Sequence, residues 1–139
     1  MISFDDRRML SQVSLRRLIT RRFCKAVSFT ESEFDSRALT ELQRVADVID
    51  SRMESIGADA VDYQEGVLII EFPKGTFVLN KHTASRQIWY SSPVSSPAYF
   101  EPLTSSGKRW WSVRLQVSLS SMFSLDIYKL TGKRIDIEE

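Results

Sequence analysis

The sequence predicts an α+β fold, a two-layer αβ sandwich in which two helices pack on one face of an antiparallel sheet of five to seven strands. Apolar residues recur every three or four positions between Thr30 and Gly57, and again after Ser118, as they do in amphipathic helices. Between these segments lie short runs rich in β-branched and aromatic residues, separated by Gly and Pro. The connections between the runs are short, which favours antiparallel pairing because parallel neighbours need long crossovers.

The first helix is expected to begin after Thr30 and to end at Gly57. Thr30-Glu31-Ser32-Glu33 has the form of a capping box, in which a hydroxyl and a carboxylate satisfy the first free backbone N–H groups. A glycine is a common helix terminator because it readily adopts a left-handed conformation. The predicted buried stripe of this helix consists of Leu39, Leu42, Val45, Ala46, Ile49, Met53 and Ile56.

Six strands are expected at 60–63, 67–72, 76–80, 86–91, 99–101 and 110–115. In the fourth of these, Gln87 and Trp89 fall on one face, and Ile88 and Tyr90 fall on the other. A second helix should follow Ser118 and stop at Gly132, and its apolar stripe consists of Leu119, Met122, Phe123, Ile127 and Leu130. The short segment containing Ile135 and Ile137 is expected to pack back on the core.

Composition excludes several classes of protein. The chain has 139 residues, of which 42% are hydrophobic and 27% are charged, values ordinary for a soluble globular protein and unlike those of a collagen-like or fully disordered chain. No apolar run approaches the ~18 residues needed to cross a bilayer. A single cysteine, Cys24, excludes an internal disulfide framework and a zinc site built on several thiolates.

The first 27 residues differ in charge from the rest. Residues 1–30 carry seven basic and two acidic side chains, whereas residues 31–139 carry 12 basic and 16 acidic ones, a net charge of −4. We interpret 1–27 as a disordered mitochondrial targeting leader, cleaved near Phe23–Ala26, and 28–139 as the folded domain. Asp5 and Asp6 are unusual in such leaders, and the alternative is a disordered basic arm, or one that binds nucleic acid electrostatically.

Conventional catalytic constellations are absent from the sequence. His82 is the only histidine, so there is no Ser-His-Asp triad, and the five glycines are too far apart to form a phosphate-binding loop. We therefore interpret His82 as a solvated or structural side chain. No organic cofactor and no certain catalytic residue are predicted.

Acidic side chains form the first candidate site. Asp47, Asp50 and Glu54 share one sector of the first helix at helical spacing, and Asp59 and Asp62 follow and could extend the same edge. Oxygen ligands suit hard cations such as Mg²⁺, Mn²⁺ and Ca²⁺ and, more weakly, Fe²⁺. The sequence therefore predicts a weak and unselective metal site, and the alternative is a solvated helix face.

The sheet supplies the second candidate site. Gln87 and Trp89 share one strand face, and Asn80 and Arg86 lie nearby in the sequence. If the helices cover the opposite face, Trp89 is exposed, and an exposed tryptophan among amide and cationic groups is typical of a protein-binding hot spot. In the alternative arrangement, Trp89 fills the core and Ile88 faces outward.

Several segments of the chain resemble the frataxin family. The stretch from Asn80 to Pro93, N-K-H-T-A-S-R-Q-I-W-Y-S-S-P, is similar to the family pattern N-K-Q-x-P-x-x-Q-I-W-L-S-S-P. Gly66-Val67-Leu68 with Phe72, the run Gly75 to Asn80, and Gly107-Lys108-Arg109-Trp110 followed by Val117-Ser118-Leu119 match further family segments. The resemblance covers about residues 31–131 and implies the frataxin-like form of the αβ sandwich.

The resemblance also implies a location and a function. It implies a mitochondrial matrix protein that helps iron–sulfur cluster assembly by docking on the complex of cysteine desulfurase and scaffold, promoting sulfur transfer and binding or delivering weakly bound Fe(II)/Fe(III). The alternative activity attributed to the family is ferroxidase, the oxidation of Fe(II) by O₂, with iron storage and haem supply through ferrochelatase as related roles. Neither nucleic acid nor a membrane is expected as a partner.

Matching positions can be transferred from the family one by one. Asn80, Gln87 and Trp89 match the sheet residues that contact the assembly complex, while Asp47, Asp50 and Glu54 match acidic helix positions and Asp59 and Asp62 lie near the family's acidic edge. His82 and Ala84 replace the usual Gln and Pro, and Pro97-Ala98-Tyr99-Phe100 stands where many members carry a cationic residue. The first half of the helix, Phe34–Val45, has fewer acids than is typical, which argues more against high-capacity iron binding than against scaffold binding.

A third hypothesis, unrelated to the family, is a nucleic-acid module that stacks bases on Trp89, Trp110 and Trp111. The net negative charge of the body argues against it, because binding to phosphates needs a positive surface.

Overall fold

The computed structural model describes residues 28–103 and 109–137. They form the predicted two-layer sandwich, with helices and a seven-stranded antiparallel sheet. The helices and strands in chain order are α2 (Glu31–Ser51), α3 (Met53–Ile56), β1 (Ala60–Gln64), β2 (Val67–Phe72), β3 (Gly75–His82), β4 (Gln87–Ser91), β5 (Ala98–Pro102), β6 (Trp110–Ser112), β7 (Val117–Ser118) and α4 (Leu119–Thr131). The predicted leader, 1–27, lies outside the described residues.

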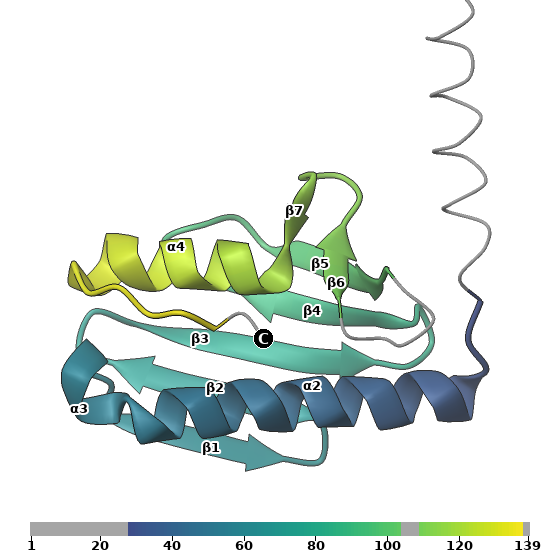
Figure 1. Cartoon of the computed structure of the whole chain (residues 1–139), viewed down its shortest axis with the longest axis horizontal. Coiled ribbons are helices and arrows are strands. Elements are labelled where there is room, and N and C mark those ends of the chain that lie inside the picture. Colours follow the sequence, from purple (N-terminus) through teal and green to yellow (C-terminus); the bar gives the residue numbers. More distant parts are fainter. Residues whose placement is uncertain (1–27, 104–108, 138–139) are drawn as a thin grey trace, which may run out of the picture.

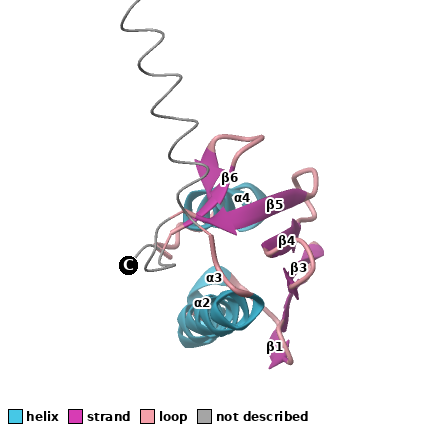
Figure 2. Ribbon diagram, turned by 90° about the vertical axis from the view of Figure 1, so that its right-hand side faces the viewer, coloured by secondary structure: helices cyan, strands magenta, loops and turns pink. Residues whose placement is uncertain are grey.

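The strands are hydrogen-bonded in sequence order, from β1 at one edge to β7 at the other. Figures 1 and 2 show α2 and α4 on the same side of this sheet, with α2 against β1–β3 and α4 against β6 and β7. Among the described residues, no helix is long and apolar enough to cross a membrane.

Alternation along the strands decides which side chains enter the core. In β4, Ile88 and Tyr90 are buried while Trp89 between them is exposed, because successive side chains of a strand point to opposite faces. The covered face carries aromatic rings that pack edge to face, such as Phe77 on Phe123 of α4, whose centroids are 5.1 Å apart. On the other face of the sheet, which we call the open face, the described residues place no helix (Figure 2).

The first predicted helix is interrupted near its end. Its capping box is confirmed, since the Thr30 hydroxyl accepts from the Glu33 N–H and the Glu33 carboxylate accepts from the Thr30 N–H. The helix does not run unbroken to Gly57, however. Arg52 has φ −118° and ψ 7°, which ends α2 at Ser51, and the short α3 then stops at Gly57 with φ 76°.

The predicted stripe of the first helix also needs correction. Leu42, Val45, Ala46, Ile49 and Ile56 are buried, but Leu39 is 37% exposed and Met53 is half-buried. Phe34 and Ala38 take the inner positions of the first turns instead. The stripe drifts around the helix because 3.6 residues per turn does not match a strict three–four repeat.

The last predicted strand, 110–115, is shorter than expected, and a strand that was not predicted follows it. Only Trp110–Ser112 is extended, and residues 113–116 form a turn that leads to β7. Gln116 adopts a left-handed conformation, with φ 54°, and its N–H donates to the Ser112 carbonyl at 2.8 Å. A left-handed non-glycine residue gives no signal in the sequence, so the turn could not be foreseen.

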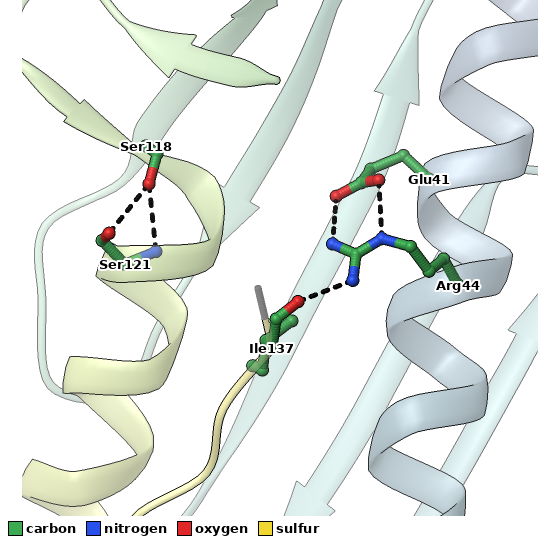
Figure 3. A network of polar contacts seen from close by, with 5 residues as sticks. All are labelled: Glu41, Arg44, Ser118, Ser121 and Ile137. Atoms are coloured by element: carbon green, nitrogen blue, oxygen red, sulfur yellow. Dashed lines mark hydrogen bonds and ion pairs between the residues drawn. The ribbon is translucent and has the colours of Figure 1, made fainter. Parts of the chain in front are cut away.

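The second helix and the segment after it follow the prediction. Ser118 caps α4 by accepting from the Ser121 N–H, and Gly132 ends it with φ 73°. Ile135 and Ile137 are both buried, and the segment that contains them runs between α2 and α4 (Figure 1). Arg44 holds the end of this segment, because its Nη1 donates to the Ile137 carbonyl at 2.6 Å while Nε and Nη2 donate to the buried Glu41 carboxylate (Figure 3).

Candidate functional site

The open face carries an exposed tryptophan at the centre of the sheet. Trp89 is 37% exposed, whereas its neighbour Ile88 is fully buried. The predicted orientation of this strand is therefore confirmed, and the alternative with Trp89 in the core is wrong. The register places Asn80 of β3 and Tyr99 of β5 directly opposite Trp89, on either side of it.

Two rings hold the indole of Trp89. The imidazole of His82 stacks on it with ring centroids 3.8 Å apart and an angle of 12° between the planes. Tyr99 meets it edge to face, with centroids 5.4 Å apart. Offset stacks and edge-to-face pairs are the favourable arrangements of aromatic rings. Contacts on two sides therefore restrict the indole to one orientation.

A chain of hydrogen bonds ties the indole to the next strand. The Trp89 Nε1–H donates to Gln87 Oε1 at 3.2 Å, and Gln87 Nε2 donates to Glu101 Oε1 of β5 at 3.1 Å. We call His82, Gln87, Trp89, Tyr99 and Glu101 the Trp89 cluster. Because Gln87 accepts the only donor of the indole, the cluster offers a partner its ring surface and the oxygens of Glu101.

The turn between β3 and β4 is fixed to the first helix. Thr83 Oγ1 donates to Asp35 Oδ1 of α2 at 2.7 Å, and Lys81 Nζ lies 3.2 Å from the same oxygen. The hydrogen bond from Thr83 and the charge of Lys81 hold the pKa of Asp35 below its ordinary value. On the other side of the turn, His82 Nδ1 lies 2.7 Å from Ser85 Oγ. The contact with Ser85 in the same turn thus helps to orient the imidazole that stacks on the indole of Trp89.

Arg86 is placed differently from the other predicted partner-binding residues. It lies in the turn, exposed, with φ 52°, and not on β4 as predicted. The left-handed conformation reverses the chain so that Gln87 can pair with His82. Asn80, Gln87 and Trp89 share the open face, and Arg86 stands at the end of their two strands.

The predicted metal ligands are exposed but dispersed. Asp47 and Asp50 lie on α2, whereas Glu54 lies beyond the break at Arg52, on α3. Asp59 precedes β1, and Asp62 pairs with Ile69 on the open face of the sheet. We call these five residues the acidic edge. Within the part of the chain that the structure describes, no three His, Cys, Asp or Glu side chains gather closely enough to hold a metal ion.

The carboxylates of the acidic edge also have local uses. Asp47 Oδ1 accepts from Gln43 Nε2 at 2.8 Å, one turn earlier on α2, and Asp62 Oδ1 accepts from Gln64 Nε2 at 3.3 Å. Single carboxylates of this kind bind a divalent cation weakly, because affinity grows with the number of oxygen ligands.

The family follows from comparison with known proteins. The model of the frataxin-like domain matches residues 27–133. Mitochondrial frataxin of Caenorhabditis elegans is 31% identical over 134 residues, which cover 92% of this chain and 96% of that protein. The chain belongs to the frataxin family.

Other members agree in sequence or in structure. The mitochondrial frataxin homologue of Schizosaccharomyces pombe is 32% identical, over 81% of this chain and 72% of its own. The trimeric yeast frataxin of Saccharomyces cerevisiae, crystallised as a complex with ferrous iron, has 27% identity and a TM-score of 0.61, covering 77% of this chain and 90% of that one. Frataxin from Psychromonas ingrahamii, at 20% identity and a TM-score of 0.61, covers 80% of this chain and 100% of its own and shares the fold.

Membership of the frataxin family supports an iron-related role, and the names of the relatives support a mitochondrial location. Membership of the family gives no role to the residues at which this chain departs from the family pattern. His82 and Tyr99 are two of them, and both contact Trp89.

Sequence reasoning missed His82, Tyr99 and Glu101 as members of the site. Tyr99 and Glu101 alternate with the buried Ala98 and Phe100, so alternation alone would have placed them on the open face. His82 needed the register with Gln87, which no sequence signal supplies. Trp110 is buried, so it cannot act as the stacking platform that the nucleic-acid hypothesis required.

Proposed function

We propose that this frataxin-family chain helps mitochondrial iron–sulfur cluster assembly by docking through the Trp89 cluster on the complex of cysteine desulfurase and scaffold, where it promotes sulfur transfer. The observation that carries the proposal is the exposed, doubly packed indole of Trp89. Tryptophan in a rigid setting is the commonest hot-spot residue, because little conformational entropy is lost when a partner covers it.

The surroundings of the indole support docking of a protein. Asn80 lies beside it on β3, and Glu101 accepts from Gln87 at its other side, so polar groups surround an aromatic centre. Interfaces commonly have this arrangement of an apolar centre and a polar rim. Sulfur transfer itself needs no catalytic group from this chain, since the proposed role is to shift the complex toward its active conformation.

The test is a reconstituted sulfide-production assay with the cognate desulfurase and scaffold. Trp89→Ala should weaken binding to the complex about thirtyfold, the loss typical of a hot-spot truncation. The matched control is Tyr128→Ala, which removes an exposed ring of α4 far from the open face and should leave stimulation unchanged. Equal stimulation by wild type and Trp89→Ala at limiting protein would contradict the proposal.

We propose further that the acidic edge supplies weakly bound Fe(II), which is consistent with the ferrous complex of yeast frataxin. The dispersal of Asp47, Asp50 and Glu54 favours loose binding over ferroxidase activity, since oxidation at a defined centre needs several ligands on one ion. Anaerobic titration with Fe(II) should give weak binding that falls gradually as the three carboxylates are changed to amides. Fe(II) oxidation at an unchanged rate in the triple variant would show that these residues are not an oxidation site.

We also propose that residues 1–27 direct the chain to the mitochondrial matrix and are cleaved there. Their arginine-rich composition supports this function. N-terminal sequencing of the protein from its native organism should give a mature chain that begins near Phe23–Ala26. A mature chain that begins at Met1 or Ile2 would contradict the proposal.

A further inference from the structure

Two neighbouring elements, the β6–β7 turn and α4, carry further exposed apolar side chains away from the Trp89 cluster. They are Val113 and Leu115 in the turn and Leu125 and Tyr128 on α4, each between 40% and 52% exposed. Large exposed apolar side chains that occur together mark an interaction surface, whereas single ones are ordinary. We call these four residues, with the basic residues around them, the α4 surface.

The turn and the helix are continuous. The β6–β7 turn rises beside the N-terminal end of α4, and β7 enters the helix directly through the capping residue Ser118 (Figure 1). On α4 the buried residues Leu119, Met122, Phe123 and Ile127 face the sheet. The opposite stripe contains Ser121, Leu125, Tyr128 and Lys129, all exposed.

Basic residues accompany the apolar ones. Arg114 lies between Val113 and Leu115 in the turn, and three more basic residues, Lys129, Lys133 and Arg134, lie at or just beyond the end of α4. All four basic residues are exposed. Between 113 and 135 the only acid is Asp126, which is buried and accepts from the hydroxyls of Tyr90 and Ser95; the exposed Asp136 follows. The α4 surface is thus positive on a body whose net charge is negative.

The arrangement has the properties of a surface that enters a membrane interface. The guanidinium of Arg134 lies 5.5 Å from the ring centroid of Tyr128, so a cation and an amphipathic aromatic ring stand side by side. Tyrosine and long basic side chains can place apolar atoms among acyl chains while their polar ends stay at the headgroups. The apolar groups also project from a turn and a helix, a shape that a fluid bilayer accommodates without a complementary pocket.

We propose that the α4 surface docks this protein reversibly on a bilayer that contains anionic phospholipid. The basic residues would attract the bilayer, and Val113, Leu115, Leu125 and Tyr128 would enter its interface, as in interfacial amphipathic helices. This proposal replaces the expectation from the sequence that no membrane is a partner. It is independent of the proposed docking through the Trp89 cluster, which lies on the open face of the sheet.

The test is vesicle flotation with the full chain, using vesicles of phosphatidylcholine alone and of phosphatidylcholine mixed with phosphatidylglycerol. Wild type should float with the mixed vesicles only. Lys129→Glu with Lys133→Glu should reduce the bound fraction at least about tenfold, since each basic residue near such a surface contributes about fivefold. Val113→Ser with Leu125→Ser should also reduce it, because both side chains are exposed and are expected to insert.

Trp89→Ala is the matched control and should float as wild type does. Every variant keeps residues 1–27, so attraction of the basic leader to the vesicles is the same in all of them. Binding that is lost in both double variants and kept in the control supports the proposal. Equal binding by wild type and either double variant would overturn it, as would loss of binding in Trp89→Ala. A wild-type chain that binds neither kind of vesicle would also overturn the proposal. That result would favour an acidic protein as the partner of the α4 surface.

Discussion

The Trp89 cluster and the acidic edge are both exposed, yet they are built differently. In the cluster, each side chain touches another from a neighbouring strand, through two ring contacts and one hydrogen bond, and a second hydrogen bond joins Trp89 to Gln87 within β4. In the acidic edge, the carboxylates are distributed over α2, α3, the start of the sheet and its open face, and Asp47 and Asp62 each accept a hydrogen bond from a glutamine near in sequence. Side chains that contact one another are ordered before a partner binds, whereas isolated side chains are not. Only the Trp89 cluster is therefore suited to tight and specific binding.

The largest effect on stability is expected from truncation of a side chain on the buried face of β4. Ile88→Ala should lower the free energy of unfolding by about 3 kcal/mol, since it removes a fully buried side chain and leaves a cavity. Trp89→Ala should lower it by only about 1 kcal/mol, the value of its ring contacts. Urea denaturation of both variants checks this. A larger loss from Trp89→Ala would mean that the cluster supports the fold and is not mainly a docking surface.

The hydrogen-bond chain offers a sharper test of order within the cluster. Gln87→Ala should free the indole N–H and leave Glu101 without its amide donor, at a cost of about 0.5–1 kcal/mol in unfolding free energy. The ¹H–¹⁵N signal of the Trp89 indole should move and broaden. His82→Gln, which restores the residue typical of the family, should keep the hydrogen bond between the Trp89 indole and Gln87 and remove the stacking of the imidazole on the indole. An indole signal that is unchanged in both variants would contradict the ordering described for the cluster.

The anchor of the β3–β4 turn should respond to acid. The folded-state pKa of Asp35 is lowered, first by the Thr83 hydroxyl and then by Lys81, so its contribution to stability is present above the unfolded-state value near 3.8 and is lost as the pH falls through the folded-state value. Asp35→Asn should therefore be less stable than wild type at neutral pH, and the difference should shrink as the pH falls below 3.8. Urea midpoints measured across this range check the sign. A difference that grows with acid would contradict it.

The smallest effects are expected at the acidic edge. Asp50→Asn should change the unfolding free energy by no more than about 0.5 kcal/mol, as at most exposed positions. If Asp47 and Asp50 bind cations separately, the losses of Mn(II) binding free energy caused by Asp47→Asn and Asp50→Asn should be additive in a double-mutant cycle. A strong coupling would show that the two carboxylates share one ion.

Much of the fold could be predicted because the sequence marks the ends of the helices and the buried face of the strands. The capping box at Thr30, the glycines at 57 and 132 and the alternation in β4 each specify a local structure that the sheet and helices then use. The break at Arg52 and the turn at Gln116 were not predicted, because each depends on a non-glycine residue that leaves the regular helical or extended conformation, which residue type does not signal.

The candidate site could be predicted only in part. Trp89 was foreseen because a single strand fixes which of its residues share a face. The contacts that order it depend on strand register, which places His82 opposite Gln87 and Tyr99 opposite Trp89. The gathering of carboxylates at the acidic edge was assumed from one continuous helix, and the interruption at Arg52 removes that assumption.

The anchored end of the chain has a practical consequence for anyone who labels this protein. Ile137 is buried and its carbonyl receives a hydrogen bond from Arg44. A fluorescent protein or affinity tag fused after Glu139 would begin three positions beyond this anchored residue. Such a fusion would pull on the segment that fills the space between the helices, so a flexible spacer should precede it.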